Sequence, residues 1–162
     1  LLGATFQAAE LKPPVAYPLN REYVLRDFAR SARFEGLPYV APEVFPIATQ
    51  NAARLFWWLQ ETRGAPAAAA WARTGLRAYF TQGVRLDDPA ALWALAATQD
   101  IAPAEAEAVC GAPEWKARLK RANDEAIAAG VFGAPFFVID GEPFWGNDRR
   151  PQIERWLASG PF

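Results

Sequence analysis

The chain has 162 residues, is 52% apolar and carries 17 basic against 18 acidic residues, for a net charge of −1. This length and apolar content predict a compact region with a hydrophobic core and exclude a disordered segment. The absence of a basic stripe argues against nucleic acid as a partner, because phosphate binding needs clustered Lys and Arg. No apolar run reaches the roughly 20 residues of a membrane span, so we expect a cytoplasmic protein without a membrane partner.

Three residue types are missing or rare. The chain has no His, which removes the usual general base and the commonest metal ligand, so no metal site is expected. Its one cysteine, Cys110, can form neither a disulfide nor a Cys-x-x-Cys pair within the chain, and no cation stands nearby to activate it, which predicts a structural role. There is also no Met, and Leu1 is a large residue. We therefore expect that the chain begins inside a longer reading frame or has lost its start.

The first third of the chain mixes short elements with prolines. Leu1 to Phe6 is apolar and fits either the end of a strand or a short helix. Three prolines then mark an irregular connector. Residues 37–47 place further prolines between Tyr39, Phe45 and Ile47, which predicts an aromatic loop because proline removes the N–H that a helix needs.

Apolar residues at helical spacing, bounded by Gly and Pro, predict six helices around and after this loop. Asn20 is the expected cap of the first, and Asp88-Pro89 is a strong helix start, an acid followed by Pro at the first helical position. The predicted helices run over residues 20–36, 49–63, 67–80, 89–98, 103–110 and 113–129.

Strand patterns appear only near the end of the chain. Phe136 to Ile139 and Phe144-Trp145 flank Asp140-Gly141, a strong signal for a hairpin turn. Pro143 has no N–H to donate, so the second strand should lie at a sheet edge. The residues of a closing helix that should pack back onto this sheet are Ile153, Trp156 and Leu157.

This order of elements predicts an α/β fold that is mostly helical by residue count and contains a large all-helical insertion. Residues 1–13 and 131–162 are expected to build the sheet-containing part, with residues 14–130 as the insertion. A lone hairpin is only marginally stable in water, so it should pair with a further strand. An unpaired sheet edge would also favour a homodimer.

Two features of the last segment can contact a peptide-like ligand. If the Ala134-Pro135 bond is cis, the backbone groups of Ala134 face outward and can pair with an extended ligand; the alternative is an ordinary trans proline. At Asn147-Asp148, free N–H groups of a helix start suit a carboxylate while the acid suits a cation, as in an amino-acid head group; the alternative is simple capping. Trp145, beside Gly146, is either a ligand wall or core filler.

Residues 130–149, GVFGAPFFVIDGEPFWGNDR, closely resemble the C-terminal signature of the 2-hydroxychromene-2-carboxylate isomerases. These are thioredoxin-fold proteins related to kappa-class glutathione transferases and to DsbA-like oxidoreductases. LLGATF with the following Pro-Pro pair, and REYVLRDFARSARFEGLPYVAPEVFP, resemble the region after the family's second strand and its first inserted helix. The resemblance covers essentially the whole chain and implies a thioredoxin-like fold.

The resemblance also implies a ligand and a reaction. Family members bind glutathione, with the backbone beside the cis-proline holding the cysteinyl part, and they isomerise an aromatic pyruvate, in equilibrium with its cyclic hemiketal, during aromatic-compound breakdown. Glutathione thiolate adds to the substrate, allows bond rotation and leaves. The matching glutathione-binding positions here are Ala134, Pro135, Trp145, Gly146, Asn147 and Asp148. Positions expected to line the pocket of the small aromatic carboxylate are Phe6, Lys12 and Phe45.

Two departures from the family pattern qualify this expectation. The family's Ser-Pro motif, whose Ser stabilises the thiolate, has no match in residues 1–162, so we expect that serine upstream of Leu1 and assign no catalytic residue in this chain. Glu10-Leu11 also stand where relatives commonly have Gly-Asn. The alternatives to the isomerase are a kappa-like glutathione transferase and a non-catalytic or truncated thioredoxin-fold binding protein.

Overall fold

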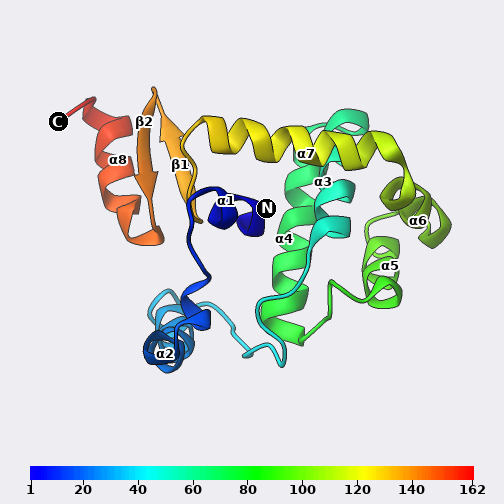
Figure 1. Ribbon diagram of the computed structural model, residues 1–162, viewed down its shortest axis with the longest axis horizontal. Helices are drawn as coiled ribbons and strands as arrows, with labels where there is room; N and C mark the ends of the chain where they lie inside the picture. The colour runs from blue at the N-terminus through cyan, green and yellow to red at the C-terminus, as the bar shows by residue number, and fades with distance from the viewer. The chain divides into compact units, whose positions relative to one another are not determined.

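A computed structural model describes all residues from 1 to 162 (Figure 1). Helices account for most of the chain, and the only strands form one hairpin. The elements are α1 (Leu2–Ala8), η1 (Pro14–Ala16), α2 (Pro18–Phe34), α3 (Gln50–Thr62), α4 (Ala65–Gln82), α5 (Pro89–Ala97), α6 (Pro103–Gly111), α7 (Pro113–Ala128), β1 (Phe136–Ile139), β2 (Glu142–Trp145), η2 (Asn147–Arg149) and α8 (Arg150–Ser159). None of these helices combines the length and apolar character needed to cross a bilayer.

The chain divides into two compact units. The terminal unit comprises residues 1–12 and 123–162, and the helical unit comprises residues 13–122. The second boundary falls inside α7, whose last turns belong with the terminal unit, whereas the sequence pattern sets that boundary at residue 131. Each unit packs around its own set of side chains.

The helical unit holds the larger core. Leu55, Leu92 and Ile101 are completely buried, and they come from α3, α5 and the loop that precedes α6. Two aromatic side chains also donate to backbone carbonyls: Trp71 Nε1 donates to the Ala52 C=O at 2.8 Å, and the Tyr79 hydroxyl donates to the Val44 C=O at 2.6 Å. These bonds tie α4 to α3 and to the aromatic loop that the sequence predicted.

Most helices in this unit begin at a proline, and few begin with a capping side chain. The Asp88 carboxylate accepts from the Ala91 N–H at 3.0 Å, which confirms the predicted cap of α5. The prediction of Asn20 as the cap of α2 is wrong, because that helix begins two residues earlier at Pro18. Proline fixes φ near the helical value and lacks the N–H that a first turn leaves unpaired, so Pro18 starts the helix without a capping side chain.

The terminal unit contains the hairpin. Strands β1 and β2 pair antiparallel in the register Phe136↔Trp145 to Ile139↔Glu142, around the predicted Asp140-Gly141 turn. Helix α8 lies along this hairpin (Figure 1), where the Trp156 ring meets Phe144 edge-on at 5.7 Å and its Nε1 donates to the Asp140 carboxylate at 3.3 Å.

Two expectations for this unit are wrong, and one stays a prediction. The strand alternative for Leu1 to Phe6 is wrong, since α1 covers these residues from Leu2 and buries Thr5. No third strand joins the hairpin among residues 1–162, so the further strand expected beside it stays a prediction. Leu157 does not pack onto the sheet either: it is 68% exposed, because α8 turns Trp156 toward β2 instead.

Candidate functional site

The backbone just before β1 exposes unpaired hydrogen-bonding groups. The Ala134-Pro135 peptide bond is cis, as the family resemblance implied, and the trans alternative is wrong. Both residues are exposed, and the Ala134 N–H and C=O have no hydrogen-bond partner within the protein. The Pro135 C=O, in contrast, accepts from the Gly146 N–H at 3.0 Å. The ladder between the strands thus continues one step beyond Phe136↔Trp145, and it holds the Ala134 backbone beside the residues that follow β2.

Trp145 forms a wall over this backbone. A Cβ added at Gly133 would lie 2.4 Å from the indole Nε1, so the indole packs directly on the glycine. The Trp145 ring meets Phe132 edge-on at 4.9 Å, and Phe132 meets Phe136 at 5.4 Å. Trp145 remains 54% exposed. This exposure is against the core-filler interpretation and leaves one face of the indole open to a ligand.

The turn after β2 presents free donors beside a carboxylate. Gly146 has φ of 110°, a conformation that favours glycine, and the chain then enters η2. The N–H groups of Asn147 and Asp148 have no partner within the protein. One Asp148 oxygen lies against Gly146, so that an added Cβ would be 2.4 Å from it, and the other pairs with the Arg149 guanidinium at 3.2 Å.

The predicted capping role of Asn147 or Asp148 is wrong. Neither side chain bonds to a backbone N–H at the start of η2 or α8, because the short 3-10 turn puts Arg149, not either polar residue, directly before α8. The Asp148 side chain is 72% exposed and points its charge to solvent. The same residues therefore offer what the ligand interpretation requires: unpaired N–H donors for an anion and a nearby carboxylate for a cation.

The residues predicted to contact a substrate lie in different places. Phe6 is half-buried in α1, where its C=O accepts from the Leu11 N–H, and Lys12 is exposed at the edge of the terminal unit. Phe45 belongs to the helical unit, where its ring packs against Phe28 at 5.5 Å and Phe80 at 6.5 Å. Their proposed contact with a substrate remains a prediction.

Sequence reasoning missed two members of the site, Phe132 and Gly133. Phe132 joins the Trp145 stack and also lines a depression of about 130 Å³ in the terminal unit, together with Thr5 and Ile127. The GVFG stretch before the proline contained the signal, since a glycine flanked by an aromatic residue next to a turn often marks a close approach. Only the strand register shows which side chain approaches it.

Cys110 lies outside this site, in the core of the helical unit. It is 4% exposed, its Sγ lies 3.5 Å from the Asn51 C=O, and burial raises the pKa of the thiol to about 11. The predicted structural role is therefore confirmed in physical terms, because a protonated, enclosed thiol is a poor nucleophile. The expectation that no cation stands nearby is wrong, since Arg54 donates to the Cys110 C=O at 3.1 Å, but its charge offsets only part of the rise in pKa that burial causes.

Comparison with known proteins identifies a protein family and a related enzyme. A family model described as a DSBA-like thioredoxin domain matches residues 3–158. A 2-hydroxychromene-2-carboxylate isomerase of Sphingobium xenophagum is 29% identical over 149 residues, which span 86% of this chain and 72% of the isomerase.

A solved structure of an enzyme with the same name is also similar to this chain. The structure of a selenomethionine 2-hydroxychromene-2-carboxylate isomerase (HCCA isomerase) matches with a TM-score of 0.83 at 22% identity, over 98% of this chain and 76% of that one. These matches confirm the predicted thioredoxin-like fold, and both matched proteins carry the name of the family that the terminal segment resembles.

Burial of Cys110 predicts low thiol reactivity in the folded protein. A pKa of about 11 leaves the thiol protonated at pH 8, so reaction with a disulfide reagent should be roughly a hundredfold slower than for an unperturbed cysteine, and its rate should rise about tenfold per pH unit and level off only near pH 11. The rate of reagent absorbance change measures this for a single group, since Cys110 is the only cysteine. Denaturant provides the control by restoring ordinary reactivity. Fast reaction of the native protein at pH 8 would contradict the buried placement.

The contact between Gly133 and Trp145 predicts a local effect of Gly133→Ala. The new methyl group overlaps the indole, so Trp145 must move, at an expected cost of about 1–3 kcal/mol in unfolding free energy. The indole N–H resonance of Trp145, assigned with Trp145→Phe, reports the movement. Gly3→Ala is the matched control, because nothing lies within 4 Å of its added Cβ. An unmoved Trp145 resonance in Gly133→Ala would show that the two do not touch.

Proposed function

We propose that this chain, which belongs to the family of DSBA-like thioredoxin domains, is a glutathione-dependent isomerase that acts on 2-hydroxychromene-2-carboxylate or a related aromatic pyruvate. The 29% identical isomerase supports the reaction type. The observation that supports glutathione is the pair of unpaired N–H groups at Asn147 and Asp148 beside the Asp148 carboxylate. A cytoplasmic location, where glutathione is the main thiol pool, is part of the proposal.

The γ-glutamyl end of glutathione matches the turn after β2. It carries an ammonium and a carboxylate on one carbon atom. The N–H groups of Asn147 and Asp148 suit the carboxylate, and the Asp148 side chain suits the ammonium a few ångströms away. Gly146 is needed at the start of this turn, because a side chain there would collide with Asp148.

The cysteinyl part matches the backbone before β1. The free N–H and C=O of Ala134 are the donor and acceptor of an unpaired strand position, and an extended peptide satisfies both by pairing antiparallel with it. Trp145 then covers the peptide through its exposed face. Pro135 fixes the direction in which the Ala134 groups point, and its own C=O is already used by Gly146.

When bound, glutathione would supply a thiolate nucleophile that adds to the substrate, permits rotation about the former double bond and leaves again. The residues of this chain bind and orient that thiol. Cys110 does not supply the nucleophile, because it is buried and protonated. Within the terminal unit, Lys12 and the aromatic ring of Phe6 are the proposed contacts of the acidic aromatic substrate, in keeping with a role in aromatic-compound breakdown.

Calorimetric titration with glutathione tests the binding half of the proposal. Wild type should bind, and Asp148→Asn, which keeps the shape but removes the charge, should bind about tenfold more weakly because one charge-assisted contact is lost. Glu142→Gln is the matched control, since it removes an exposed carboxylate from the same hairpin. The dipeptide Cys-Gly, which lacks the γ-glutamyl group, should bind both Asp148 forms equally. Equal glutathione affinity of wild type and Asp148→Asn would contradict the assignment.

An absorbance assay of 2-hydroxychromene-2-carboxylate isomerisation tests the reaction half. Because the thiolate-stabilising serine is expected upstream of Leu1, the assay uses the protein extended by that upstream segment. Addition of glutathione should raise its rate above that of the protein alone, and Trp145→Ala should reduce the gain because the ligand loses its wall. S-methylglutathione, which cannot form a thiolate, should give none. A rate independent of glutathione, with binding intact, would reject the isomerase and retain only the binding site.

A further inference from the structure

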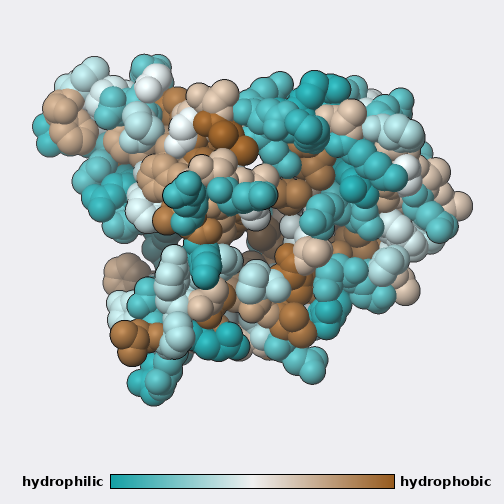
Figure 2. All heavy atoms as spheres, in the orientation of Figure 1, coloured by the Kyte–Doolittle hydropathy of each residue, from teal (hydrophilic) through white to brown (hydrophobic).

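A cavity of about 260 Å³ lies between helices α4 and α5 in the helical unit. Its lining residues are Thr74, Arg77, Ala78 and Gln82 from α4, with Leu95 and Thr98 from the end of α5. Figure 2 shows hydrophilic and hydrophobic side chains intermixed over the part of the view that holds α4 and α5. All six residues belong to the helical unit, so the cavity shares no residue with the candidate glutathione site.

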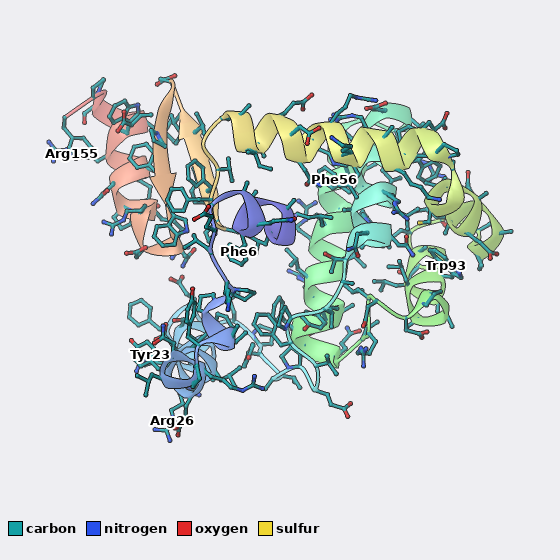
Figure 3. The ribbon with its side chains drawn as sticks, in the orientation of Figure 1. Phe6, Tyr23, Arg26, Phe56, Trp93 and Arg155 are labelled. Atoms are coloured by element: carbon teal, nitrogen blue, oxygen red, sulfur yellow. The ribbon has the colours of Figure 1, made fainter.

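Ala78 and Leu95 form the apolar part of the cavity. Ala78 is 2% exposed, and Leu95 is half-buried against the core of the helical unit. On α4, Thr74 and Gln82 lie four residues before and after Ala78, so helical spacing places all three on one face. On α5, Trp93 (labelled in Figure 3) precedes Leu95 by two residues, about 200° around the helix, and lines no part of the cavity. The cavity therefore combines an apolar wall with polar groups along its length.

The guanidinium of Arg77 is the one charged group among the lining side chains. It forms no ion pair, hydrogen bond or contact with an aromatic ring in the protein. By contrast, Arg63 pairs with Glu105, and Arg85 pairs with Asp87. A guanidinium presents two parallel N–H donors that match the two oxygens of a carboxylate. A ligand of this cavity is therefore expected to carry a carboxylate.

Two helix C-termini at one end of the cavity limit the charge of the ligand. Gln82 is the last residue of α4, and Thr98 directly follows the last residue of α5. Each helix C-terminus carries roughly half a negative charge, which opposes a doubly charged group such as phosphate. The Thr98 hydroxyl donates to the Leu95 C=O at 2.7 Å, so its oxygen is left as an acceptor. This end of the cavity therefore suits a ligand hydroxyl group that donates a hydrogen bond.

We propose that this cavity is a binding site for a small hydroxylated aromatic monocarboxylate. The carboxylate pairs with Arg77, the ring packs on Ala78 and Leu95, and the hydroxyl group donates to Thr98 Oγ1. Arg77 and Gln82 lie about 7.5 Å apart along the axis of α4, a separation that one ring with substituents at opposite ends spans.

The size of the cavity also favours a single ring. Its volume is below the roughly 300 Å³ at which sites for drug-sized ligands begin. A rigid ring holds the carboxylate and the hydroxyl group apart without the ordering cost that a flexible chain would have on binding. The site is additional to the proposed isomerase site and does not rest on that proposal.

Titration with para-hydroxybenzoate, followed by two-dimensional NMR of the amide groups, tests the site. The resonances of Thr74, Gln82 and Thr98 should shift together and saturate, with a Kd on the order of 1 mM for so small a ligand. Arg77→Gln should weaken binding about tenfold, because a charge-assisted contact is lost. Arg73→Gln, at an exposed arginine of α4 that does not line the cavity, is the matched control and should bind as wild type does.

Changes in the ligand separate the two polar contacts. Benzoate, which lacks the hydroxyl group, should bind wild type several-fold more weakly, and Thr98→Val should abolish this difference. The uncharged para-hydroxybenzamide should bind wild type and Arg77→Gln equally. Arg77 and Thr98 are both exposed, so each variant should keep its helical circular dichroism. Equal affinity of wild type and Arg77→Gln for para-hydroxybenzoate, shifts confined to the terminal unit, or no saturable shift at tens of millimolar ligand would overturn the proposal.

Discussion

One backbone hydrogen bond, from the Gly146 N–H to the Pro135 C=O, holds the candidate site together. The hairpin register would otherwise end at Phe136↔Trp145, and the backbone segments on either side would be joined by side-chain contacts alone, such as those of Trp145 with Phe132 and Gly133. With the bond in place, the unpaired groups of Ala134 and those of Asn147 and Asp148 are presented from two adjoining stretches of chain. A site that contacts both ends of a short peptide depends on the distance between these two stretches. In short strands, each further cross-strand pair helps to fix that distance.

Glycine makes the arrangement possible at two points, for different reasons. At Gly133 the requirement is space, because the Trp145 indole occupies the position of a side chain; at Gly146 it is both space and a positive φ. The sequence predicted the hairpin, the exposed alanine and the donors after β2, because turn chemistry is local. It did not predict the Trp145 contact with Gly133, since strand pairing creates that contact between residues twelve positions apart.

Errors of prediction in both units have a common physical origin. Asn147 and Asp148 favour capping in general, but a 3-10 turn displaced the start of α8 past them. Asn20 is likewise a good cap that proline made unnecessary. In α2 the inner apolar face was recognisable by its period, whereas the exposure of Leu19 and Phe34 on the same helix was not. Local preference therefore identified the helices from α2 to α8, left α1 open between a helix and a strand, and misplaced the starts of α2 and α8.

The position of Cys110 bears on how such a fold can host thiol chemistry. Fold and function are separable, and chemistry resides in the site. In this chain the sulfur lies in the helical unit among apolar side chains, where burial opposes ionisation and Asn51 and Arg54 occupy its polar surroundings. The exposed features of the terminal unit are instead the unpaired backbone groups of Ala134, the Trp145 ring and the turn at Asn147 and Asp148. The glutathione proposal assigns these features to a peptide ligand that carries its own thiol, and it therefore does not depend on Cys110, which burial keeps protonated.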